Sequence, residues 1–91
     1  MVIAGPASEQ LASNIAKRLN IRIINPEVRI FADGESKIKI ESVENKQCII
    51  IQSLYPPIDR HILQLLMMIQ KCRKDKALKT IVVIPYMAYA R

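Results

Sequence analysis

The 91-residue chain has only two glycines, Gly5 and Gly34, and this scarcity excludes two common kinds of nucleotide site. A P-loop and a dinucleotide-binding fingerprint each need several closely spaced glycines, which let the backbone approach a phosphate group. Two glycines that lie far apart in the sequence cannot form either motif. Any nucleotide that this chain binds must therefore be held in another way.

Histidine and cysteine are scarce as well, with His61 as the single histidine. His61 has no second histidine with which to form a metal-binding pair, and nothing places it near a nucleophile. We expect it to be a partly exposed polar residue. Cys48 and Cys72 lack the close spacing of a zinc or redox motif, and we expect both to be buried and reduced. These residues predict neither a metal site nor a catalytic triad.

The chain has no long apolar run, since the longest, from Leu65 to Ile69, is far too short to cross a membrane. The amino terminus has no basic stretch followed by an apolar core and a cleavage site. We therefore expect a cytoplasmic protein with no membrane partner. Aromatic residues make up 4% of the chain and hydrophobic residues 51%, so aliphatic side chains must form the core, as in α/β sheets.

Negative charge is in the minority, with 8 Asp and Glu residues against 14 Lys and Arg and a formal net charge of +6. Such a chain attracts polyanions, so a small basic nucleic-acid-binding module is one class to consider. However, no aromatic residues lie among the basic ones as platforms for base stacking. We therefore expect no nucleic-acid partner.

The first apolar segments predict a strand, a turn and a helix. Residues 1–4 form a short apolar run that Gly5 and Pro6 end. Ser8 can then cap a helix, and Glu9 lies favourably in its first turn. The predicted apolar face of this helix consists of Leu11, Ala12, Ile15, Ala16 and Leu19.

Two later runs, residues 48–51 and 80–84, are continuous and β-branched, as in strands covered on both faces in the middle of a parallel sheet. Residues 59–74, between them, have helical periodicity. The predicted apolar face of this helix consists of Ile62, Leu65, Leu66, Ile69 and Cys72, and it is widened by Leu63, Met67 and Met68. The helix either meets a second subunit or is a deeply buried crossover helix. The fold class is an open, mostly parallel, doubly wound α/β sheet.

Residues 28–41 form a different pattern, because Asp33 and Gly34 interrupt two short alternating runs, as in a β-hairpin. A two-residue turn would place Ile30 opposite Lys37 and so set apolar against charged side chains along the ladder. We therefore predict an odd-numbered loop of three or five residues.

The odd-numbered loop is expected to pair Ile30 with Ile38 and Val28 with Ile40, which places apolar side chains opposite one another. The other face of the hairpin is then polar. This polar face would carry Arg29, Phe31, Lys37 and Lys39. The single phenylalanine is thus expected to point away from the apolar side of the hairpin.

The carboxyl ends of the parallel strands are the first candidate site, because ligands of open α/β sheets bind there. These ends are Gly5-Pro6, residues 53–55 and residues 86–91. Arg91 is the strongest charge there for a phosphate group, and a solvated arginine with no ligand is the alternative.

The hairpin turn is the second candidate site, with Phe31, Asp33 and Glu35 around a glycine. The face of an aromatic ring can stack on a purine, and a carboxylate can accept a hydrogen bond from the exocyclic amine. The alternative is ordinary turn chemistry, with Asp-Gly for backbone geometry and Glu for solubility.

Three ordered motifs resemble those of the ribose-phosphate pyrophosphokinases, and the resemblance extends over the whole chain. They are Phe31-Ala32-Asp33-Gly34-Glu35, Ile50-Ile51-Gln52-Ser53 and Ile84-Pro85-Tyr86-Met87-Ala88-Tyr89-Ala90-Arg91. The resemblance implies that residues 1–91 are an amino-terminal domain of phosphoribosyltransferase type, truncated before its end. In the family a second domain of this type follows.

The resemblance also implies an activity, the transfer of the diphosphoryl group of ATP to ribose 5-phosphate with release of AMP, in a homo-oligomer that is a dimer or a hexamer. It implies Mg²⁺, with the metal ligands and catalytic residues expected beyond Arg91. In the family, residues that match Phe31, Asp33 and Glu35 hold the adenine of ATP bound mainly by a neighbouring subunit. The arginine that matches Arg91 contacts ATP on its own subunit.

One segment departs from the family pattern. Where many bacterial members have Val-Arg-Gly-Gly, this chain has Val-Glu-Asn-Lys at residues 43–46, so Glu44 replaces an arginine linked to regulation by phosphate or ADP. This replacement argues against such regulation.

A non-catalytic partner of complete subunits is the alternative to an enzyme portion. Without a helix after its last strand, the chain alone is expected to self-associate.

Overall fold

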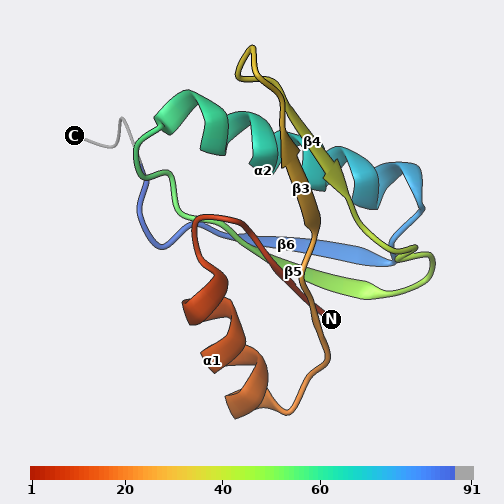
Figure 1. Cartoon of the computed structure of the whole chain (residues 1–91). Coiled ribbons are helices and arrows are strands. Elements are labelled where there is room, and N and C mark those ends of the chain that lie inside the picture. The colour runs from red at the N-terminus through yellow and green to blue at the C-terminus, as the bar shows by residue number, and fades with distance from the viewer. Residues whose placement is uncertain (88–91) are drawn as a thin grey trace.

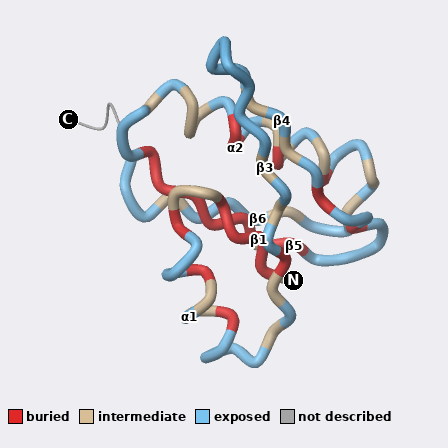
Figure 2. The backbone as a smooth tube through the Cα atoms, in the orientation of Figure 1, coloured by how far each residue is buried: buried red, intermediate tan, exposed pale blue. Residues whose placement is uncertain are grey.

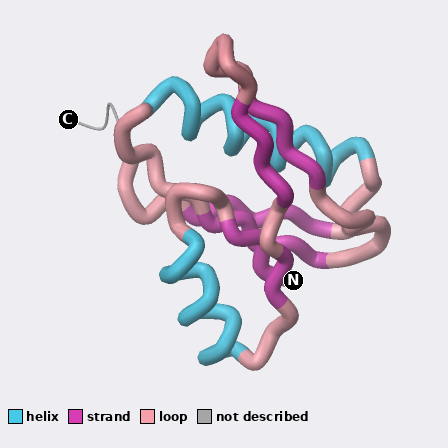
Figure 3. Tube along the Cα trace, viewed as in Figure 1, coloured by secondary structure: helices cyan, strands magenta, loops and turns pink. Residues whose placement is uncertain are grey.

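The computed structural model describes residues 1–87 and arranges them as a parallel sheet with a separate antiparallel hairpin (Figure 1). The sheet has the strand order β2-β1-β5-β6, and its strands are β1 (Val2–Ala4), β2 (Ile23–Ile24), β5 (Gln47–Ile51) and β6 (Lys79–Val83). The helices α1 (Glu9–Leu19) and α2 (Ile58–Lys74) lie on opposite faces of this sheet (Figure 3). The predicted open, mostly parallel α/β sheet is therefore confirmed.

The two central strands, β1 and β5, divide the core into two apolar layers. Ile3 and Ile50 are neighbours in the parallel register, are fully buried and face α2. Val2 and Ile51 point to the opposite face and pack with residues of α1. Figure 2 shows the buried backbone concentrated where the sheet passes between the helices. In the described part of the chain, neither helix is long and apolar enough to span a membrane.

The strand β6 lies at an edge of the sheet, so the prediction that residues 80–84 are central and covered on both faces is wrong. Within residues 1–87, β6 pairs with β5 alone. Ile81 is 42% exposed, and Val82 and Val83 are each 37% exposed. A continuous β-branched run predicts a strand that can be covered on both faces, but it does not say which neighbour covers it.

The helix α1 follows Ser8 as predicted, but the Ser8 side chain does not cap it. The Ser53 N–H donates to Ser8 Oγ at 2.9 Å, and the Ser8 hydroxyl donates to Ser53 Oγ at 3.0 Å. Of the predicted apolar face, only Ala12 and Ala16 are buried. Leu11 is 40% exposed and Leu19 is 54% exposed.

The helix α2 is rotated relative to the predicted apolar face. Leu65 and Cys72 are buried as expected, whereas Leu66 is 54% exposed, so its predicted place in the core is wrong. Met68, expected only to widen the face, is fully buried, and so is Gln64. The hairpin covers α2 on the side of Gln64. The buried residues of α2 therefore face both the sheet and the hairpin, whereas the predicted apolar face assumed contact with the sheet alone.

Both cysteines are buried and free, as predicted. Burial raises the pKa of the Cys72 thiol to about 11, with a further contribution from Cys48. The Cys72 thiol therefore stays protonated at neutral pH, and a protonated, buried thiol is a poor nucleophile.

The hairpin consists of β3 (Glu27–Ile30) and β4 (Ser36–Lys39), with residues 31–35 as the loop. The predicted odd-numbered loop is confirmed, but the predicted pairing is wrong by two residues. Ile30 lies opposite Ser36, and Val28 lies opposite Ile38. Within the five loop residues the Phe31 N–H donates to the Glu35 carbonyl at 2.7 Å, so residues 32–34 form the tip of the loop.

A shift by two residues preserves which side chains share a face, because side chains alternate with a period of two. The face that carries Val28 and Ile38 lies on α2, where Ile38 packs against the core and Gln64 Nε2 donates to Ser36 Oγ at 3.3 Å. The opposite face is exposed to solvent. It carries Glu27, Arg29, Lys37 and Lys39.

Candidate functional site

The carboxyl ends of the three longer parallel strands meet at one edge of the sheet, as predicted. The Gly5 N–H donates to the Ile51 carbonyl at 2.8 Å, and the Leu54 N–H donates to the Tyr86 carbonyl at 2.9 Å. These two bonds join the segments that follow β1, β5 and β6. Arg91, the residue predicted to bind phosphate here, lies outside the described residues.

The polar side chains at this edge bind one another and the backbone. Gln52 is fully buried, with Oε1 accepting from the Ala7 N–H at 3.0 Å and Nε2 donating to the His61 carbonyl at 3.4 Å. Ser53 is 2% exposed and binds Ser8. This role of Gln52 was not predicted, although a glutamine directly after a buried strand is itself a signal of a buried hydrogen-bonding group.

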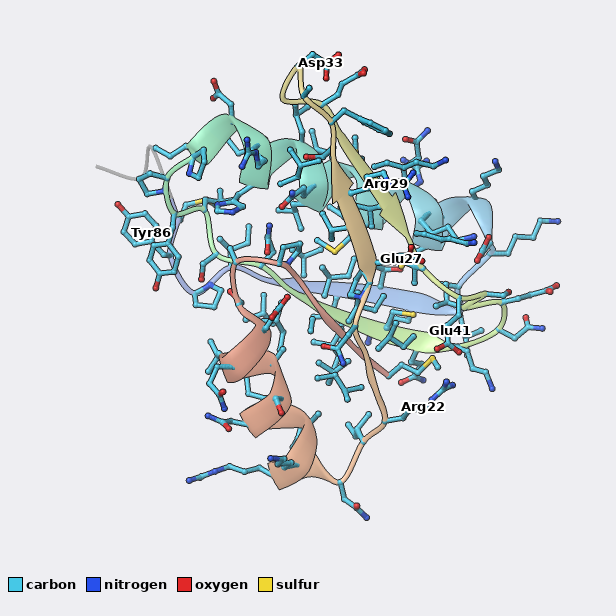
Figure 4. The ribbon with its side chains drawn as sticks, viewed as in Figure 1. Arg22, Glu27, Arg29, Asp33, Glu41 and Tyr86 are labelled. Atoms are coloured by element: carbon cyan, nitrogen blue, oxygen red, sulfur yellow. The ribbon has the colours of Figure 1, made fainter. Side chains whose placement is uncertain are left out.

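Two tyrosines lie at the same edge, in segments that were predicted to end there, but the contact between them was not predicted. Tyr55 and Tyr86 stack with ring centroids 5.1 Å apart, although they come from different segments. Tyr55 is 48% exposed, and Tyr86, which is labelled in Figure 4, is 41% exposed. The His61 ring nitrogen Nδ1 lies 2.7 Å from the Tyr55 carbonyl. The single histidine thus has a structural role, because it fixes the segment that contains Tyr55.

The hairpin loop is ordered by its own backbone and by Asp33. The Gly34 N–H donates to the Phe31 carbonyl at 2.9 Å, and the Glu35 N–H donates to Asp33 Oδ1 at 3.0 Å. Gly34 has a φ of +89°, which L side chains rarely adopt. The turn chemistry proposed as an alternative for Asp33 is therefore present. This turn uses only one carboxylate oxygen of Asp33. The other Asp33 oxygen and the Glu35 carboxylate are left to accept hydrogen bonds.

The loop side chains lie on the surface and away from the carboxyl edge. Phe31 is 42% exposed, and Asp33 and Glu35 are also exposed. Figure 4 shows Asp33 at the end of the hairpin, well separated from Tyr86. The structure thus brings Phe31, Asp33 and Glu35 together in one loop, and it does not bring them to the carboxyl edge of their own sheet.

No metal site is evident in residues 1–87, where no three His, Cys, Asp or Glu side chains come together in a way that could hold an ion. Asp33 and Glu35 are two carboxylates, and one oxygen of Asp33 already accepts from the backbone. The described residues therefore do not fit a Mg²⁺ site.

The comparison with family models identifies the chain. The model described as the N-terminal domain of ribose phosphate pyrophosphokinase matches residues 1–91. This chain belongs to that family. It is thus related to transferases of the kinase type that act in nucleotide biosynthesis.

Named relatives agree with this membership in the ribose-phosphate pyrophosphokinase family. The chain is 34% identical to the ribose-phosphate pyrophosphokinase of Sulfurisphaera tokodaii, matching 100% of the chain and 32% of the relative. It is 40% identical to that of Thermotoga maritima, over 99% of the chain and 29% of the relative. A crystal structure of phosphoribosylpyrophosphate synthetase from Mycobacterium smegmatis superimposes with a TM-score of 0.92 at 29% identity, covering 100% of the chain and 31% of that protein. The chain thus spans about a third of the length of these relatives.

The segment that departs from the family pattern keeps a tight turn. Asn45 has a φ of +60°, a left-handed conformation that a glycine adopts without strain and that asparagine tolerates better than most residues. Glu44 is exposed beside it. The replacement of Val-Arg-Gly-Gly by residues 43–46 is thus compatible with the turn and changes its charge.

Proposed function

We propose that this chain is the part of a ribose-phosphate pyrophosphokinase that presents loop 31–35 to the adenine of ATP bound mainly on a neighbouring subunit. The proposed reaction transfers the diphosphoryl group of ATP to ribose 5-phosphate, which gives phosphoribosyl pyrophosphate and AMP. The observation that carries this proposal is the exposed position of Phe31, Asp33 and Glu35, away from the carboxyl edge of their own sheet. The choice of ATP as the ligand rests on the resemblance of the loop motif to that of the family.

Each loop side chain has a role that follows from its chemistry. The ring of Phe31 stacks on the purine, since its exposed face is available to a flat ligand. The free oxygen of Asp33 and the carboxylate of Glu35 accept from the exocyclic amine. The backbone bonds within the loop fix these groups before the ligand arrives, which lowers the entropy lost on binding.

The contribution of this chain to the reaction is orientation of ATP. Holding two reactants in a productive geometry removes a large part of the entropic barrier to phosphoryl transfer. In this proposal, Arg91 contacts ATP on its own subunit, and the residues that bind Mg²⁺ and ribose 5-phosphate belong to the part of the family's sequence that follows. We place the reaction in the cytoplasm, where buried thiols such as Cys48 and Cys72 stay reduced.

A chimera with the Thermotoga maritima relative tests this function, with residues 1–91 replacing the matching part of that enzyme. The chimera is expected to form phosphoribosyl pyrophosphate, and the unjoined chain, as the negative control, is expected to form none. In the chimera, Phe31→Ala should weaken ATP binding by the loss of one stacked base, about 1–3 kcal/mol. Leu19→Ala, which removes another exposed apolar side chain outside both candidate sites, should leave the ATP requirement unchanged.

Mixing subunits separates a shared site from a site within one subunit. Phe31→Ala subunits are mixed with subunits inactivated in the part contributed by the relative, so that each parent is impaired for a different reason. Some mixed sites then combine an intact loop from one chain with an intact catalytic part from the other. Recovered activity supports the shared site. A mixture no more active than the average of its parents would place Phe31 in its own subunit's site.

A further inference from the structure

Two exposed tyrosines join the segments that follow β5 and β6. The rings of Tyr55 and Tyr86 are stacked, with their centroids 5.1 Å apart and an angle of 20° between their planes. In the backbone of the same two segments, the Leu54 N–H donates to the Tyr86 carbonyl at 2.9 Å. The segments are thus joined twice at one point, once by the backbone and once by side chains.

Tyr55 is itself held by helix α2. His61, in the first turn of α2, places its ring nitrogen Nδ1 2.7 Å from the Tyr55 carbonyl. Because a carbonyl oxygen can only accept a hydrogen bond, Nδ1 carries the hydrogen and donates it. The His61 N–H in turn donates to the Pro57 carbonyl at 3.1 Å. A chain of contacts therefore runs from α2 through His61 and Tyr55 to Tyr86.

The segment after β6 depends on such contacts, because β6 lies at an edge of the sheet. In residues 1–87, β6 pairs with β5 alone. Tyr86 and Met87 are both exposed, so little burial fixes the backbone there. The stacking with Tyr55 therefore contributes directly to the position of the backbone at Tyr86. The same segment leads to Arg91, which follows Tyr86 in the sequence and lies outside the described residues.

We propose that Tyr55 and Tyr86 are positioning residues, whose stacking holds the segment after β6 in the conformation in which Arg91 contacts ATP. This inference rests on the proposed function, which assigns that contact to Arg91, and it adds two residues that do not touch the nucleotide. Stacking of two aromatic rings favours one arrangement by roughly two- to tenfold in population. A ligand that binds only this arrangement loses affinity in proportion to the population that is lost. Removing either ring should therefore weaken ATP binding without removing a contact to ATP.

The chimera with the Thermotoga maritima relative allows the effect on ATP to be measured, with calorimetry giving the dissociation constant. Tyr55→Leu and Tyr86→Leu should each raise the dissociation constant for ATP about two- to tenfold and leave that for ribose 5-phosphate unchanged. Tyr55→Phe keeps the ring and should change neither constant. Leu78→Ala, which removes an exposed apolar side chain just before β6, should also change neither.

Substitution of Arg91 separates positioning from direct contact with ATP. If the tyrosines act through Arg91, Tyr55→Leu should not weaken ATP binding further when it is combined with Arg91→Gln, because the contact that it positions is already gone. Tyr55→Leu combined with Tyr86→Leu should likewise cost no more than either alone, because both remove the same stacking. Additive effects of Tyr55→Leu and Arg91→Gln would mean that the tyrosine contacts ATP itself, which would overturn the inference.

Amide hydrogen exchange in the 91-residue chain tests the positioning without any ligand. The Leu54 N–H should exchange about two- to tenfold faster in Tyr55→Leu and Tyr86→Leu, because its acceptor, the Tyr86 carbonyl, is held in place for less of the time. Tyr55→Phe should leave this rate unchanged. The Gln52 N–H, which donates to the Val83 carbonyl at 3.1 Å, is the internal control and should keep its rate in every variant.

The outcomes distinguish this inference from the proposed function. If Tyr55→Leu matches Tyr55→Phe in Leu54 exchange or in ATP binding, the inference is overturned, while product formation by the chimera would still support the proposed function. If Arg91→Gln alone leaves ATP binding unchanged, the inference fails together with the proposed role of Arg91, and the role of Phe31 is not affected. If the variants behave as expected but the chimera forms no product, the inference is supported and the proposed reaction is wrong. If the chimera does not bind ATP at all, both are wrong.

Discussion

The carboxyl edge of the sheet and the hairpin loop both match motifs of the family, yet their polar side chains are used in opposite ways. At the edge, Ser8, Gln52 and Ser53 are buried and bind groups of the same chain. In the loop, Phe31 and Glu35 are exposed. The comparison teaches that a motif can build the framework or contact a ligand, and that burial and hydrogen bonding distinguish the two.

The two glycines provide the largest test of this difference. A Cβ at Gly5 would clash with the Gln52 side chain and would lie 2.5 Å from the Ile51 carbonyl oxygen, so Gly5→Ala should lower the free energy of unfolding by about 3 kcal/mol or more. A Cβ at Gly34 would meet open space, and Gly34→Ala should cost about 1–2 kcal/mol for its positive φ alone. Urea unfolding measures both. Equal losses of unfolding free energy in the two variants would contradict the difference between a buried framework at the edge and an exposed loop.

Removing one oxygen from each region should give a smaller contrast. Ser8→Ala leaves the buried Ser53 N–H without its acceptor, and the free energy of unfolding should fall by about 1–3 kcal/mol. Asp33→Ala removes an exposed bond to the Glu35 N–H and should cost about 0.5 kcal/mol or less. The same variant should weaken adenosine binding, which Ser8→Ala should not do while the fold is retained. Thermal unfolding measures the stability of both variants, and titration with adenosine measures their binding.

The smallest contrast concerns two exposed aromatic side chains. Tyr86→Ala removes the stacking with Tyr55 and should cost about 0.5–1.5 kcal/mol of stability. Phe31→Ala should leave stability unchanged to within about 0.5 kcal/mol, because a ring that serves a ligand contributes little to its own fold. Calorimetry of the two variants measures the difference. A larger loss for Phe31→Ala would indicate that this ring belongs to the core.

The sequence predicted those features that depend on periodicity and chemistry. The odd-numbered loop followed from the alternation of apolar and charged residues, and that alternation also predicted the shared face of Arg29, Lys37 and Lys39. The hairpin pattern also predicted an outward group of Phe31, Asp33 and Glu35 around the turn, and these residues are exposed. Each of these depends on local pattern, which a single sequence contains.

The features that the sequence did not predict depend on contacts between distant segments. Ser8 looked like a helix cap, but it binds Ser53, which is 45 residues away in the chain. Leu66 fitted the apolar stripe of α2, but the hairpin packs beside Gln64 and leaves Leu66 exposed. The position of β6 at the edge depends on which strands are present to pair with it. None of these choices can be made from the local pattern alone.

The covering of the hairpin by α2 has a consequence for the order of events after synthesis. A two-stranded hairpin alone is marginally stable in water, and its apolar face, with Val28 and Ile38, requires a partner. That partner is α2, which is made later than β3 and β4 and packs on this face. The loop that we propose to serve a neighbouring subunit therefore takes its final form only in a chain whose second helix has docked. Assembly through this loop would select correctly folded subunits.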